Sequence, residues 1–586
     1  MRVSPKPIGA LVLASACALV LGLGCTNKNR ASEQAAASAL AVRPDLPEPR
    51  GVLGELTLLH PGASFAAFRE VGGLAAALLP AGFPMFVATA FGLPPLSADS
   101  FDPDLPVFGA LLEGENAQPG WVLAVHAVSG PELVAKLTTG DHAPFHSGSG
   151  AVAGLTLLQP NTAPGSSLAA ARSLAVFDNY FLVASTGDAL QAVGPYAARM
   201  LPKHALPQAP IALRFSKRSL SSQVVPALRG MWAGYRTSLS HLDQDERSAH
   251  GGRPPDFGDP AQVILGADTV VESALSLIDG AAALELDLAP FPKRIEATLL
   301  LQPEESSDAH TRLAALAAGT AKPLLSLPAE TQFALGISRT ADEREAAGKA
   351  AGDDWVRLLG ARLSAVGATQ LRATLGDWEL GRGLRSCYGF LGGSEPGAYL
   401  VTDVSDSARL KHAGQGLFAL FSVPGVRAPV SEFLGDPHVA EGSAPKAEVL
   451  PNVSRKQLTF TPNAAHKAPV PPLAFAWLVS DQVGYAAAGK NADPVLKKVL
   501  DSASGQGETL AGKAGIAEGV QRIGDQAAVF AYLDARLVLP PAPSGGPASP
   551  PAPLLLALGK RGNSGYLQLE ISKPVIDLAL HRALGF

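Results

Sequence analysis

The sequence predicts an α+β protein made of two tandem related modules, each a mostly antiparallel sheet packed with helices. Three observations predict this fold. Strand-like runs are joined by short turns, and hairpin connections favour antiparallel pairing. The same order of strand-like and helix-like segments recurs in both halves of the chain. Of the 586 residues, 47% are hydrophobic and 17% charged, a composition that allows a sizeable core.

The recurrence is visible as a constant offset between matching segments. The strand-like runs LTLLQP (155–160) and LTFTPN (458–463) lie 303 residues apart. The runs at 173–186 and 476–489 keep the same offset, so no gap separates the matched pairs. A repeated supersecondary unit is the expected origin of such an offset.

Another pair of segments follows one plan in both halves. Residues 119–137 and 396–413 each begin with Pro-Gly and continue as a strand. The strand should turn into a helix at Ser129 in the first copy and at Ser405 in the second.

Turns and a helix start follow in each half. Hairpins are expected at 178–179 (Asp-Asn) and 481–482 (Asp-Gln), since such residues favour tight turns. In the second half, Asp493 should cap a helix whose first residue is Pro494.

Both halves also end alike, with a strand-like run followed by a helix. The run RIEATLLLQP leads to a helix predicted from about Ser306, and GYLQLEISKP leads to one predicted to reach Phe586. We therefore predict a first α+β module at 51–325 and a second at 326–586.

The N-terminus has the features of an export signal. Arg2 and Lys6 precede an apolar run from Ile8 to Leu23, and residues 1–24 contain no acidic residue. The run stops at Cys25, where polar residues begin. A cleaved signal peptide at 1–24 is predicted.

This junction resembles a bacterial lipoprotein signal, although Gly22 stands where leucine is usual. The resemblance implies that Cys25 is lipidated, with palmitate among its acyl chains, and anchors the chain in the cell envelope, in the outer membrane. Residues 25–50 would then form a lipidated flexible tether. Lipidation at Cys17 and an uncleaved anchor helix are the alternatives.

No residue pattern in the body indicates a catalytic, cofactor-binding or metal site. The motif GETLAGKA (507–514) has Ala514 where a phosphate-binding loop needs a hydroxyl. The cluster Asp141, His142 and His146 is interrupted by a proline and favours a solvated loop over a metal site. Cys387 has no neighbouring base in the sequence, so an inert thiol is expected.

Two apolar segments leave alternatives open. Residues 71–98 carry no charge but contain four prolines, which argue against one membrane-spanning helix. Two short core helices are expected there, with an apolar flap over a ligand or a lipid surface as the alternative. Residues 219–242 predict an amphipathic helix, packed on the core or, alternatively, on a partner.

The segment 510–537, which ends in the strand-like run around Tyr532 and Asp534, resembles a family of uncharacterised exported bacterial proteins with duplicated α+β modules. The resemblance covers roughly residues 51–586. It implies the fold and the compartment, and it carries over no catalytic residue.

These patterns favour a non-catalytic envelope lipoprotein with a binding or structural role. Its expected partners are the membrane, through the lipid anchor, and an envelope protein or an apolar ligand. A carrier of lipid or another apolar ligand, and a hydrolase with a site that the sequence does not reveal, are the alternatives. Nucleic acid is excluded as a partner because 47 basic residues are outnumbered by 52 acidic ones.

Overall fold

The computed structural model describes residues 45–584, apart from 74–75, 77–78, 114–119, 142, 162–171, 250–259, 360–362, 443–449, 465–468 and 540–550. The predicted signal peptide (1–24), Cys25 and most of the predicted tether lie outside the described residues.

The chain divides into two compact units. Unit 1 comprises Met1–Pro226, Ala281–Gln302 and Glu570–Phe586, and unit 2 comprises Ala227–Gly280 and Pro303–Leu569. The module limits 51–325 and 326–586 stay a prediction. The protein is mixed α+β with extensive antiparallel sheet, because the strand pairs of known register run antiparallel in both units.

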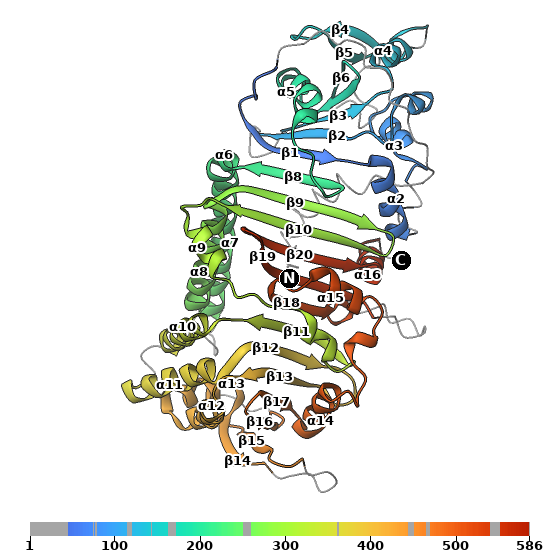
Figure 1. Cartoon of the computed structure of the whole chain (residues 1–586). Helices are drawn as coiled ribbons and strands as arrows, with labels where there is room; N and C mark the ends of the chain where they lie inside the picture. The colour runs from blue at the N-terminus through green and yellow to red at the C-terminus, as the bar shows by residue number, and fades with distance from the viewer. Residues whose placement is uncertain are drawn as a thin grey trace. The chain divides into compact units, whose positions relative to one another are not determined.

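The strands of unit 1 form a sheet in the order β4-β5-β6-β7-β3-β2-β1-β8-β9-β10 (Figure 1). Their bounds are β1 (Val52–Leu58), β2 (Val107–Leu112), β3 (Gly120–His126), β4 (Phe145–Ser149), β5 (Leu155–Pro160), β6 (Ser173–Phe177), β7 (Tyr180–Ala184), β8 (Ile211–Ser216), β9 (Ala281–Phe291) and β10 (Arg294–Pro303).

Helices cover both faces of this sheet. They are α2 (Pro61–Gly72), α3 (Phe83–Ala90), α4 (Gly130–Thr138), α5 (Gly187–Arg199), α6 (Lys217–Ser219) and α16 (Lys573–Leu584). One core contains side chains of α2, α3 and α4. The other lies under α5, and the strands supply it with Phe108, Ala110 and Val122. Successive strand residues face opposite sides, so Val107 belongs to the first core and Phe108 to the second.

The strands of unit 2 pair in the order β14-β15-β16-β17-β13-β12-β11-β18-β19-β20. Their bounds are β11 (Thr331–Ser338), β12 (Arg382–Leu391), β13 (Gly397–Val404), β14 (Asp436–Glu441), β15 (Ser454–Thr461), β16 (Leu473–Val479), β17 (Val483–Gly489), β18 (Ala527–Asp534), β19 (Pro553–Arg561) and β20 (Ser564–Ser572), the last crossing into unit 1 at Glu570.

The helices assigned mainly to unit 2 are α7 (Val225–Ala249), α8 (Pro260–Asp279), α9 (Asp308–Ala315), α10 (Ala341–Leu359), α11 (Ala365–Gly381), α12 (Ser407–Ala419), α13 (Pro424–Leu434), α14 (Ala492–Ala503) and α15 (Ile516–Ile523). Helix α14 packs on β17, β16 and β13, and α10 packs along α11.

The strand-to-helix junctions agree with the sequence in the first half and shift by one residue in the second. Ser129 caps α4, with its Oγ accepting from the backbone N–H of Glu132. Helix α12 is capped by Asp406, not by Ser405, because the Asp406 carboxylate accepts the N–H groups of Ala408 and Arg409 at 3.0 Å each. The negative charge of Asp406 is also stabilised at the helix N-terminus, where serine carries no charge.

The other predicted helix cap is also displaced. Asn491 occupies the N-cap position of α14, and Asp493 lies in the first turn, where Arg455 Nη2 contacts its carboxylate at 2.7 Å. The hairpin turns at 178–179 and 481–482 lie where the sequence predicts them.

The described residues of the uncharged segment 71–98 are core in part, and the others are half-buried or exposed. Phe83, Val87 and Ala88 of α3 are buried, and Leu96 is exposed.

The segment 219–242 is helical but packs less than expected. A π-helical turn at Leu220–Val224 precedes α7 and accommodates Pro226, which cannot donate a backbone hydrogen bond. Leu220 is buried, whereas Met231 and Tyr235 are 46% and 49% exposed. Core packing therefore does not explain the whole apolar stripe.

Candidate functional site

A row of charged side chains crosses three neighbouring strands of unit 1. Glu55 on β1 is paired in register with Arg214 on β8, and Arg214 with Glu285 on β9. Because residues directly opposite one another share a sheet face, the three side chains lie on the same side. The Nε and Nη2 atoms of Arg214 donate to Oε2 of Glu285 at 2.9 and 2.8 Å.

The next row on this face contains smaller groups. Thr57 on β1 is opposite Ala212 on β8, and Ala212 is opposite Asp287 on β9. The methyl group of Ala212 leaves space between its two neighbours. A pocket opens at this place, with Glu55, Thr57, Ala212 and Arg214 among its lining residues.

The carboxylate of Glu55 is held by two side chains from the segment that follows β7. Tyr196 on α5 donates its hydroxyl to Oε1 at 3.2 Å, and Nδ1 of His204 lies 3.1 Å from Oε2. Helix α5 begins at a Thr186 cap and packs on the sheet, which places Tyr196 over Glu55. Burial, then the Glu55 charge, raises the pKa of Tyr196 well above its usual range, so the phenol stays a donor.

One wall of the pocket is apolar. Leu201, Ala205, Leu206 and Pro207 line it between the end of α5 and the start of β8. The pocket therefore combines an oriented carboxylate with an aliphatic surface.

The carboxyl group of Asp287 lies beside the pocket and has a raised pKa. Burial, with the neighbouring Glu285 charge as the next cause, raises the pKa of Asp287 to about 7. Its Oδ1 atom is buried and has no hydrogen-bond partner among the described residues. The two carboxyls at positions i and i+2 of β9 share a face, so ionising both is unfavourable.

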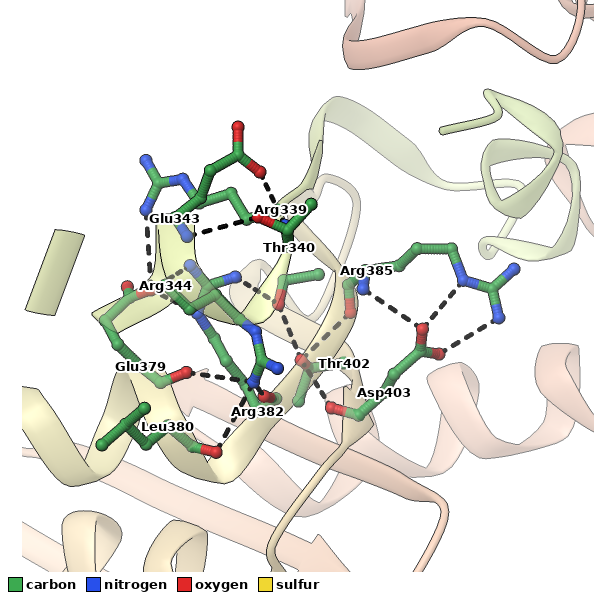
Figure 2. A network of polar contacts seen from close by, with 11 residues as sticks. Arg339, Thr340, Glu343, Arg344, Glu379, Leu380, Arg382, Arg385, Thr402 and Asp403 are labelled. Carbon is green, nitrogen blue, oxygen red and sulfur yellow. Dashed lines mark hydrogen bonds and ion pairs between the residues drawn. The ribbon is translucent and has the colours of Figure 1, made fainter. Parts of the chain in front are cut away.

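A second polar cluster lies in unit 2 between α10, α11, β12 and β13 (Figure 2). Arg382 is 1% exposed, and its guanidinium contacts the carboxylate of Glu379 and the hydroxyl of Ser386. Ser386 in turn lies 2.7 Å from the hydroxyl of Thr402 on β13. The buried charge is thus paired and its donors are used.

The second buried arginine of this cluster caps the C-terminus of α11. Arg344 of α10 donates from Nη1 to the carbonyls of Glu379, Leu380 and Arg382, at the C-terminus of α11 (Figure 2). A cation there neutralises the unpaired carbonyls of the last turn. This cluster joins helices to strands, and we assign it a structural role.

The residues considered from sequence are not brought together as a site. Cys387 is buried in β12, and burial raises the pKa of its thiol to about 12. His146 is hydrogen-bonded to Asn161 and Gln159, and His142 lies outside the described residues. Within the described ranges, no group of three His, Cys, Asp or Glu side chains is placed to hold a metal ion.

The glycine-rich motif near Lys513 lacks the context of a phosphate-binding loop. The segment 510–512 is a short 3-10 turn preceded by α14, so no strand leads into it. Among the described helices, none is both long and apolar enough to cross a bilayer.

Sequence reasoning missed the pocket because its residues are far apart in the chain. Glu55, His204, Arg214 and Asp287 come from three strands and a connecting segment. One signal was available: Glu285 and Asp287 alternate with leucines in LELDL, which places two acids on one face of a strand.

No known protein family matches the chain, and neither the curated proteins nor the solved structures include one significantly similar to it.

Proposed function

We propose that the protein is a non-catalytic cell-envelope lipoprotein, anchored through Cys25 in the outer membrane, whose globular body has a binding role. The observation that carries this proposal is the charged and then apolar leader that ends at Cys25 and is followed at once by polar residues. If the signal peptide is cleaved before Cys25 and Cys25 is acylated, Cys387 is the one thiol that remains in the mature chain. Its burial fits a fold that is stable without a disulfide.

Labelling with radioactive palmitate in a bacterial host tests the anchor. We expect label in the wild type and in Cys17→Ala, and none in Cys25→Ala, which should also leave the membrane fraction. Cys17→Ala is the matched control, because it removes the rival cysteine from the same leader. Equal labelling of wild type and Cys25→Ala would refute the anchor.

We also propose that the two halves of the body are related repeats. The pairing order of β1 to β10 corresponds, strand for strand, to that of β11 to β20, which supports this proposal. The helix after the seventh strand of each set, α5 or α14, packs on that strand and the third. An experimental structure in which the superposed halves differ in strand order would contradict it.

A binding role suits the described residues better than transport of an apolar ligand. The apolar segment 71–98, the expected roof of a lipid cavity, has Phe83 and Val87 packed in the core. The pocket over Ala212 is lined by charged and polar side chains, among them Glu55 and Arg214, as well as by apolar ones. Native mass spectrometry of the protein from its own host should show no bound lipid, and copurifying lipid would favour the carrier instead.

A further inference from the structure

The charges around the pocket of unit 1 favour a cationic ligand. Glu55 lines it, and Glu285 and Asp287 lie beside it on β9. Because the pKa of Asp287 is raised, Glu55 and Glu285 carry most of the negative charge there at neutral pH. Arg214 also lines it, and its Nε and Nη2 atoms both donate to Glu285. The arginine is therefore occupied, and an anionic ligand would meet the Glu55 carboxylate without a free counter-charge from Arg214.

Glu55 is prepared to accept such a ligand. Its Oε1 atom accepts a hydrogen bond from the Tyr196 hydroxyl, and its Oε2 atom lies beside Nδ1 of the His204 ring. A carboxylate oxygen has more than one lone pair, so each oxygen retains acceptor capacity after these contacts. A carboxylate that is already oriented loses little side-chain entropy on binding.

The apolar wall limits the kind of cation. Leu201, Leu206 and Pro207 face the same pocket as Glu55, and Leu206 is 53% exposed. A metal ion or ammonium itself would leave this surface in water. A cation on an aliphatic stem would cover it while its charged end meets the carboxylate.

We propose that this pocket binds a protonated aliphatic amine, with the ammonium group on Glu55 and the alkyl stem along Leu201, Leu206 and Pro207. The inference deepens the binding role proposed above and rests on it, but it does not depend on lipidation at Cys25. The amine can be a free small molecule or a lysine side chain that a partner protein presents.

Titration calorimetry and ligand-observed NMR with the full chain test the proposal, with n-butylammonium as the probe. We expect saturable binding of n-butylammonium, weaker binding of methylammonium, and none of butyrate or n-butanol. Glu55→Gln keeps the size of the side chain and removes its charge, so it should weaken n-butylammonium binding about tenfold. Glu132→Gln, on the exposed side of α4, is the matched control and should bind like the wild type.

The comparison of methylammonium with n-butylammonium needs no variant and holds even if Glu55→Gln fails to fold. Capped N-acetyl-lysine methylamide distinguishes the sources: binding as tight as n-butylammonium indicates a presented lysine, and its exclusion indicates a free amine. Absence of saturable binding, equal affinity for butyrate, or unchanged affinity in folded Glu55→Gln would each overturn the proposal. None of these results bears on palmitate labelling, which tests the anchor separately.

Discussion

Asp287 follows Glu285 by two residues on the same face of β9, and the two carboxyl groups compete for ionisation beside the pocket of unit 1. Burial, then the Glu285 charge, raises the pKa of Asp287 from 3.8 to about 7. The folded protein therefore binds this proton more tightly than the unfolded chain does. Its contribution to stability is complete below about pH 4 and is lost as the pH rises through about 7.

Asp287→Asn should remove this pH dependence. On going from pH 5 to pH 8, the variant should gain stability relative to the wild type by on the order of 1 kcal/mol, after allowance for solvent screening at a half-buried group. Urea unfolding at both pH values measures the difference. Asp188→Asn, exposed on α5, controls for the change in net charge. A difference between Asp287→Asn and wild type that is the same at both pH values would contradict the assignment.

Cys387 should be unreactive in the folded protein. The side chain is 4% exposed, and burial raises the pKa of the thiol to about 12, so little thiolate forms at pH 8. In a chain carrying Cys17→Ser and Cys25→Ser, Ellman's reagent should not titrate Cys387 without denaturant and should titrate one thiol per chain in 6 M guanidinium chloride. Rapid stoichiometric reaction of the native chain would show that β12 is not packed as described.

The two arginines of β12 at positions 382 and 385 should differ sharply in their effect on stability. Arg382 is buried against Glu379, so Arg382→Ala leaves that carboxylate with the longer contact to Arg339, at 3.5 Å, and should cost about 3 to 5 kcal/mol. Arg385 pairs with Asp403 where its side chain is 48% exposed, so Arg385→Ala should cost at most about 1 kcal/mol.

Chemical denaturation of both variants measures these costs, and Arg385→Ala is the control for loss of an arginine from the same strand. Similar losses in the two variants would mean that burial does not make the Arg382–Glu379 pair in Figure 2 more costly to break than the exposed Arg385–Asp403 pair.

Local signals predicted much of the fold. The pattern of strands and turns located the hairpin at 178–179, and Ser129 is the helix cap that the sequence indicates. The errors came from competition between neighbouring polar groups. Asp406 is the cap in place of Ser405, and its carboxylate accepts two backbone N–H groups. Asp493 lies inside the first turn of α14, and its carboxylate pairs with Arg455, which is remote in sequence.

The pocket could not be predicted from the sequence, because the register between strands determines which side chains line it. Glu55, Arg214 and Glu285 form a row only once β1, β8 and β9 are aligned, and a shift of one residue would turn the side chains of a strand to the other face. The partial exposure of Met231 had a similar cause: helical spacing identifies an apolar stripe but not whether another element covers it.

Replacing either of two glycines with alanine should change the stability of the protein, in opposite directions for the two positions. Gly130 begins α4 beside the hairpin at Asp178, and an added Cβ would overlap the Asp178 carbonyl oxygen. The backbone N–H of Gly130 also donates to Asn179 at 3.2 Å, so the helix start cannot shift freely. Gly130→Ala should therefore destabilise the protein by about 1 to 3 kcal/mol.

Gly230 lies on an exposed part of α7, where an added Cβ meets no atom within 4 Å. Alanine loses less conformational entropy than glycine on forming a helix, so Gly230→Ala should stabilise that helix by about 0.5 to 1 kcal/mol. Urea unfolding followed by circular dichroism gives both free energies under the same conditions. Because both variants carry the same substitution, each is the control for the other. A loss of stability in Gly230→Ala would mean that another element packs on this face of α7, whereas a neutral Gly130→Ala would mean that the start of α4 is looser than the contact with Asp178 implies.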